Sequence, residues 1–184
     1  PLPISDAFFA VRNYADFFAS SYVEYLRAAT TTTPGHMDTP EVMRRNVLGS
    51  LPNWKRVFDD FEAVFPGVQI HIWRFEDFRA LTPKILETFC GDGLDVSKLK
   101  PPQERNARPS ASARDVDEQD LKSALQGAGA LAEHSETLQD MYPQGDEYQR
   151  FDPWSAGERA HLTALYERDW QALCEDKRFV TLAA

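Results

Sequence analysis

Basic residues are scarce in this sequence. Lys and Arg number 20 against 29 Asp and Glu, which gives a formal net charge of −9. A chain this acidic lacks the basic face that broad binding to nucleic acid or to an anionic membrane requires. The charge does not exclude one small anion held by a few local arginines, so we expect a small-molecule ligand rather than nucleic acid.

Long apolar runs and cysteine are also scarce. No stretch approaches the length of a membrane span, and the N-terminus lacks the basic-then-apolar layout of a signal peptide. Cys90 and Cys174 lie far apart without metal-ligand spacing. We therefore expect no metal site, two reduced and buried thiols, and a cytoplasmic location. The chain begins at Pro1 rather than Met, which indicates a processed or excerpted polypeptide.

The apolar residues that are present suffice for one domain with a core, because 42% of the 184 residues are hydrophobic. Their periodicity alternates between strand and helix, which predicts an α/β fold with a parallel sheet and right-handed crossovers. The expected strands are 4–11 and 68–73. The expected helices are 13–29, 40–48, 53–65, 82–90, 113–125, 129–141 and 155–174.

Local signals set several of these boundaries. Pro83 suits the first position of a helix, and Gly91 suits its end. Ser155 and Glu158 form the pattern of a capping box. The helix that follows should bury one face, which comprises Leu162, Leu165, Tyr166, Asp169 and Leu173.

The clearest functional pattern is R-N-Y-A-D-F-F-A-S at 12–20. Arg12 follows a buried strand, and open α/β sheets bind ligands at the carboxyl ends of their strands. The next helix offers backbone N–H groups and a partial positive charge at its start. Ser20 shares a helical face with Asn13 and Asp16. The spacing predicts a site for a doubly charged phosphate, with Arg12 donating paired N–H bonds and Ser20 its hydroxyl.

This segment resembles the 3′-phosphate-binding motif of the sulfotransferases that use 3′-phosphoadenosine-5′-phosphosulfate (PAPS). The family pattern is an apolar strand, Arg-Asn, a few residues that include an acid, and a Ser eight positions after the Arg. Arg12, Asn13, Asp16 and Ser20 match it. The resemblance implies that Arg12 and Ser20 bind the 3′-phosphate of the cofactor.

Three further stretches resemble bacterial members of that family. They are 52–67, W-R-F-E-D-F at 73–78, and R-N-A-R-P-S at 105–110. The last resembles the loop that closes over the nucleotide, which implies cofactor contacts for Arg105 and Arg108, although the family's Arg-Lys-Gly form is absent. The implied fold is a P-loop-type α/β domain: a parallel sheet flanked by helices at 1–97, then the closing loop and a helical C-terminal extension at 98–184.

The Gly-rich phosphate loop of the family is missing, because no segment matches G-x-x-x-x-G-K-[ST]. In the family this loop lies upstream of the position of Arg12 and carries the catalytic Lys. We therefore expect one domain, 1–184, without its N-terminal strand and phosphate loop, and no catalytic residue is assigned. The implied activity is transfer of a sulfuryl group from PAPS to a hydroxyl or amine acceptor that the sequence does not identify.

Other interpretations of these residues are open. Arg12 can form a structural ion pair with Asp16 or Glu76, and Ser20 can be an ordinary exposed residue. Glu76 can cap a helix, hold Arg74 or act as a general base. A small-molecule kinase would need a Walker loop and Mg²⁺ carboxylates. A non-catalytic nucleotide-binding or interaction domain would keep the fold without the loop.

Overall fold

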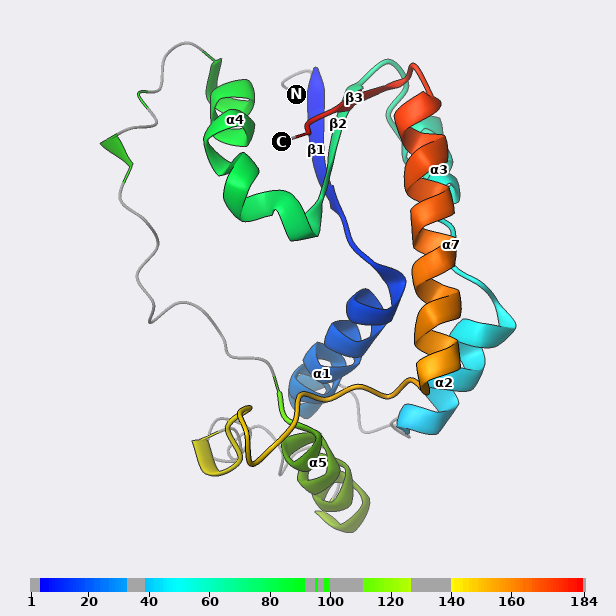
Figure 1. The fold of residues 1–184 in the computed structure, drawn as a ribbon, viewed down its shortest axis with the longest axis vertical. Coiled ribbons are helices and arrows are strands. Elements are labelled where there is room, and N and C mark those ends of the chain that lie inside the picture. The colour runs from blue at the N-terminus through cyan, green and yellow to red at the C-terminus, as the bar shows by residue number, and fades with distance from the viewer. Residues whose placement is uncertain are drawn as a thin grey trace. The chain divides into compact units, whose positions relative to one another are not determined.

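The computed structural model describes residues 4–32, 39–91, 95, 98–99, 111–126 and 140–183 (Figure 1). Within these ranges three strands and six α-helices form. In chain order they are β1 (Asp6–Val11), α1 (Tyr14–Thr32), α2 (Pro40–Gly49), α3 (Trp54–Val64), β2 (Gln69–Arg74), α4 (Phe78–Cys90), α5 (Ala113–Gln126), α7 (Ala156–Glu175) and β3 (Phe179–Thr181), with a 3₁₀ turn at Phe75–Asp77 before α4. None of the helices described is long and apolar enough to cross a bilayer.

The chain forms two compact units. The first comprises Pro1–Tyr14, Pro52–Pro102 and Ala160–Ala184, and the second comprises Ala15–Leu51 and Gln103–Arg159. The first unit contains the sheet. The beginning, the middle and the end of the sequence all contribute to it.

The sheet of the first unit is parallel, with the order β1-β2-β3. The β1–β2 register runs from Asp6 opposite Gln69 to Val11 opposite Arg74. Because parallel strands run the same way, Val11 and Arg74 end at the same edge of the sheet. The predicted α/β class and parallel sheet are confirmed. The third strand was not predicted, since no strand was expected after residue 73.

Helices cover both faces of this sheet (Figure 1). Successive side chains of a strand point to opposite faces, so Phe9 meets Phe58 and Phe61 of α3 while Phe8 meets Phe89 of α4. In Figure 1, α4 lies on one side of the strands and α3 and α7 lie on the other. The buried cluster on the α4 side comprises Trp73, Leu81, Ile85 and Leu182.

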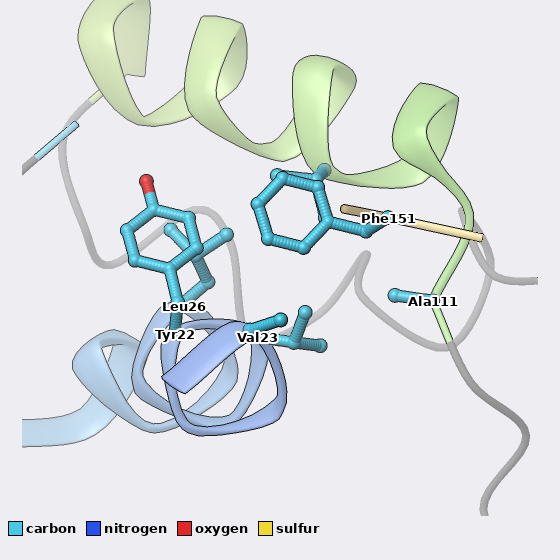
Figure 2. Close-up of a cluster of buried hydrophobic side chains, with 7 residues drawn as sticks. Tyr22, Val23, Leu26, Ala111 and Phe151 are labelled. Carbon is cyan, nitrogen blue, oxygen red and sulfur yellow. The ribbon is translucent and has the colours of Figure 1, made fainter. Parts of the chain in front are cut away.

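The second unit has its own hydrophobic core, shown in Figure 2. Tyr22 stacks on Phe151, with ring centroids 5.7 Å apart and an interplanar angle of 26°. The core comprises Ala19, Tyr22, Val23, Leu26, Ala111, Val116 and Phe151. Tyr25 lies on the same helix but outside this core, and its side chain is 46% exposed.

Several local predictions hold. Asn53 caps α3, since its Oδ1 accepts the N–H of Arg56 at 3.0 Å. Ser155 and Glu158 form the capping box of α7, with Glu158 accepting the Ser155 N–H at 2.7 Å. The α7 face that is buried consists of the five predicted residues. Gly91 ends α4 with a positive φ of 66°.

Other predictions are wrong. Both Cys90 and Cys174 are exposed rather than buried. Helix α4 begins at Phe78, so Pro83 lies inside it rather than at its first position. Proline has no backbone N–H, so one backbone hydrogen bond of α4 is missing at Pro83 although the helix continues through this position. The predicted helix at 129–141 falls almost entirely outside the residues that the structure describes.

Candidate functional site

Arg12 lies where the motif predicts it, directly after β1 at the carboxyl edge of the sheet. Its guanidinium carbon lies 4.6 Å from the centroid of the Phe75 ring, which is a cation–π contact. Its backbone carbonyl accepts the indole N–H of Trp54 at 3.0 Å. The residue is therefore held at its backbone by α3, while its half-buried side chain lies over the residue that follows β2.

Glu76 joins the two strand ends at this edge. Its carboxylate accepts the backbone N–H of Asn13 at 3.2 Å and the hydroxyl of Tyr166 at 3.1 Å. The same hydroxyl lies 3.2 Å from the carbonyl of Val11. Burial, together with the negative charge of Glu76, raises the pKa of Tyr166 well above its ordinary value. The Tyr166 hydroxyl therefore keeps its proton and can donate a hydrogen bond to Glu76. Through these two contacts Glu76 links the ends of β1 and β2 to α7.

This bridge bears directly on anion binding at the start of α1. A helix N-terminus attracts negative charge, and here a protein carboxylate already accepts one backbone donor, the Asn13 N–H. The Asn13 side-chain amide donates to Thr163 Oγ1 at 3.1 Å. An external anion at this end of α1 would therefore use the backbone donors of the first turn of the helix itself.

Arg74 pairs with an acid that is distant in the sequence. Its guanidinium forms two hydrogen bonds to Glu167 of α7, at 2.7 and 2.5 Å. It also lies over the rings of Tyr166 and Trp170, at 5.3 and 5.1 Å from their centroids. These contacts give Arg74 a structural role in fixing α7 against the end of β2.

A buried polar network surrounds the first residue of α1. The Tyr14 hydroxyl donates to Asp169 at 2.5 Å and accepts the Trp54 backbone N–H at 2.7 Å. Burial and the hydrogen bond to Asp169 raise the pKa of Tyr14 far above its ordinary value. Asp169 is thus the polar interruption in the apolar face of α7. It is buried because Tyr14 and the N-terminus of α3 satisfy its carboxylate.

In the second unit, two arginines that sequence reasoning missed lie at the first turn of α1. Arg150 and Arg159 each approach Asp16 Oδ1 at 3.3 Å, and Arg159 also binds Asp152 at 2.7 Å. No sequence pattern marks these two arginines, because their shared partner, Asp16, lies more than 100 residues away from both along the chain. With Asp152 the group is charge-balanced, which is typical of a structural ion-pair cluster.

Of the other predicted phosphate and nucleotide ligands, only Ser20 lies within the described residues. Ser20 lies on α1 and is half-buried. Arg12 belongs to the first unit and Ser20 to the second, so their convergence on one phosphate stays a prediction. Arg105 and Arg108 lie outside the described residues. His71 is a sheet histidine of β2 whose Nε2 lies 2.8 Å from Asp6 Oδ1.

Metal ligation finds no support in the parts of the chain that the structure describes, where no group of three or more His, Cys, Asp or Glu side chains is arranged to hold an ion. Comparison with protein-family models, with curated proteins and with solved structures finds no match to this chain. The assignment of function therefore depends on the residues at the sheet edge and on the motifs of the sequence.

Proposed function

We propose that this chain binds the nucleotide of PAPS and takes part in sulfuryl transfer to a hydroxyl or amine acceptor. One observation carries the proposal. Arg12 stands at the carboxyl edge of a parallel sheet, beside the W-R-F-E-D segment that ends β2 and directly before α1. Ligands of open α/β sheets bind at this edge, and the order of the two segments along the chain is that of the family motif.

The residues have distinct roles in this proposal. Arg12 donates paired N–H bonds to the 3′-phosphate, and Ser20 donates its hydroxyl to the same group. Arg105 and Arg108, which lie outside the described residues, contact the nucleotide as the resemblance of 105–110 implies. Glu76 is a positioning residue rather than a base, because its carboxylate holds the Asn13 N–H and the Tyr166 hydroxyl.

The chemistry expected of such a site is charge stabilisation. Sulfuryl transfer, like phosphoryl transfer, proceeds through a state with charge spread over the equatorial oxygens, so fixed donors and accurate positioning lower its barrier. In this proposal the residues of this chain bind and orient the nucleotide. No group that activates the acceptor or the leaving oxygen is assigned, because the sequence contains no segment like the phosphate loop.

Thermal melting in the presence of nucleotides tests the proposal. A ligand that binds only the folded state raises the melting temperature. We expect 3′-phosphoadenosine-5′-phosphate to raise it more than adenosine-5′-phosphate does, because only the bisphosphate reaches Arg12 and Ser20. Equal shifts for the two nucleotides would contradict a 3′-phosphate pocket. A larger shift with ATP and Mg²⁺ would favour a kinase, and no shift with any nucleotide would favour a non-catalytic interaction domain.

A double-mutant cycle tests the two ligands of the phosphate. Arg12→Ala should weaken binding of the bisphosphate by roughly 2–4 kcal/mol, as expected when a charge-assisted contact is lost. Ser20→Ala should cost about 1 kcal/mol. If both side chains hold one phosphate, the double variant should depart from additivity by at least about 0.5 kcal/mol.

The matched control for this cycle is Arg45→Ala, which removes the same charge from an exposed position on α2. Its binding of the bisphosphate should equal that of the unmodified chain. Additive effects of Arg12→Ala and Ser20→Ala would show that the two residues act at separate places. An unchanged affinity in Arg12→Ala would remove Arg12 from the site.

A further inference from the structure

The second unit contains a cavity between α1 and α2. Its volume is about 340 Å³. The apolar side chains that line it are Phe18, Tyr22 and Tyr25 of α1 and Met43 and Val47 of α2. None of these residues has a part in the proposed nucleotide site, so the cavity needs its own explanation.

The floor of this cavity belongs to the core of the unit. Tyr22 and Val47 are only 4% and 8% exposed. The Tyr22 ring is stacked on Phe151 (Figure 2), and Met43 packs against the same core cluster. Side chains held by core packing keep their positions when no ligand is bound. The cavity is therefore preformed, which is the usual condition of small-molecule sites.

The rim of the cavity is polar but uncharged. Ser21 and Asn46 are exposed there and offer a hydroxyl and an amide. Tyr25, which also lines the cavity, is 46% exposed. Among the described residues that line the cavity, none carries a charged side chain. A charged ligand would lose its hydration there without gaining a counter-charge.

Size and lining together select a class of ligand. Pockets for small molecules usually enclose about 300–1,000 Å³, so this cavity suits a ligand at the small end of that range. Three aromatic side chains favour a planar ring through stacked or edge-to-face contacts. The flexible thioether of Met43 can adapt to the outline of such a ring.

We propose that the cavity between α1 and α2 binds an uncharged, planar aromatic molecule of one or two rings, with a single polar substituent directed at Ser21 and Asn46. This inference goes beyond the proposed transfer reaction and does not depend on it. The apolar body of the ligand lies against Tyr22 and Val47, and its polar substituent stays at the rim.

Isothermal titration of the full chain with 2-naphthol tests this inference. We expect saturable binding of one molecule per chain with a Kd below about 1 mM, which is reasonable for a ligand of this size. Naphthalene-2-sulfonate has the same rings with a negative charge and should bind at least ten-fold more weakly. The absence of saturable binding by 2-naphthol, or equal affinity for the sulfonate, would overturn the proposal.

Two variants locate the bound probe. Ser21→Trp and Asn46→Trp each place a large ring in the cavity from an exposed rim position, one from α1 and one from α2, and each should weaken binding of 2-naphthol at least ten-fold. Val57→Trp is the matched control, because Val57 is 50% exposed on α3 and lies outside the lining. Melting curves of all three variants verify folding. Unchanged binding in both rim variants would place the probe elsewhere and refute the assignment.

Discussion

At the start of α7, the Glu158 carboxylate binds two groups at once, the Arg44 guanidinium and a backbone N–H. Its carboxylate accepts hydrogen bonds from Arg44 at 2.9 and 3.1 Å and from the Ser155 backbone N–H at 2.7 Å. The bond from Arg44, followed by the bonds from Ser155, lowers the pKa of Glu158 from 4.5 to about 2. This residue therefore couples a helix cap to an ion pair with α2 inside the second unit.

The lowered pKa predicts a pH dependence of stability. A carboxyl group with a depressed folded-state pKa stabilises the folded state above its unfolded pKa, and it loses that contribution as the pH falls through the folded value. For Glu158 the loss should occur between pH 4.5 and about 2. We expect Glu158→Gln to lower the melting temperature at pH 7 and to have a smaller effect at pH 2.5, as measured by circular dichroism.

The control for this measurement is Glu175→Gln, which changes an exposed acid at the opposite end of α7. It should show no comparable dependence on pH. A difference between Glu158→Gln and the unmodified chain that stays constant from pH 7 to 2.5 would contradict the assigned contacts.

Residues of this kind show which side-chain roles a sequence can predict. The pairing of Ser155 with Glu158 was predictable, because a capping box spans only four neighbouring positions. The contact with Arg44 was not, because 114 residues separate the two partners. Arg74 repeats this pattern: its place at the end of β2 followed from a local motif, but its partner Glu167 lies 93 residues away.

At the scale of single elements, α4 shows where glycine is required. Gly91 ends this helix with φ 66° and ψ −168°, a region that only glycine enters without substantial strain. We expect Gly91→Ala to lower the free energy of unfolding by about 1–3 kcal/mol, measured by urea denaturation. Steric crowding is not the cause of this expected loss, since no atom of the described residues lies within 4 Å of an added Cβ.

The opposite result is expected for Gly157→Ala. Gly157 lies within the first turn of α7, its φ is not positive, and no atom lies within 4 Å of an added Cβ. Alanine loses less conformational freedom than glycine in a helix, so this variant should gain roughly 0.5–1 kcal/mol. An unchanged or increased stability of Gly91→Ala would contradict the backbone conformation assigned to Gly91, and a loss of stability in Gly157→Ala would contradict the helical position assigned to Gly157.

Element boundaries were predictable only where one local signal dominated. Asn53 at the start of α3 and Gly91 at the end of α4 are such signals, and both are confirmed. The start of α4 predicted from Pro83 was wrong, because proline also occurs inside a helix when surrounding contacts favour helical structure on both sides. Here Leu81 and Ile85, on either side of Pro83, are both buried on the α4 face of the sheet.

At the scale of the whole molecule, the C-terminal strand completes the first unit. β3 pairs in parallel with β2, and the Leu182 N–H donates to the Ile72 carbonyl at 2.8 Å. The Leu182 side chain, 5% exposed, packs with Trp73, Leu81 and Ile85. Leu182 is thus part of a core cluster against which Phe8 and Ala10 of β1 also pack.

We therefore expect Leu182→Ala to destabilise the protein by about 2–5 kcal/mol, the range for truncation of a buried leucine. Chemical denaturation followed by tryptophan fluorescence would report it, because Trp73 lies in the same cluster. Val180→Ala is the control on the same strand. Its side chain is 38% exposed, so its cost should stay below about 1 kcal/mol. Similar costs for the two variants would contradict the packing of β3.

Local sequence patterns predicted the α/β class, most of the helices described, two of the three strands described and the position of Arg12 at a strand end. These features arise from periodicity, caps and turns, which are interactions among residues a few positions apart. The sequence also predicted the buried face of α7, because that stripe has a helical period. The pattern was weaker for β3, where only three residues form the strand.

Only the tertiary structure decided which apolar and polar groups are covered. Val57 and Tyr25 fit helical stripes but are about half exposed, whereas Asp169 is buried because Tyr14 and Trp54 satisfy it. The partners of Glu76, Arg74 and Glu158 were decided in the same way. Burial and ion pairing depend on which surfaces meet across the fold, and that is a property of packing between distant segments rather than of local pattern.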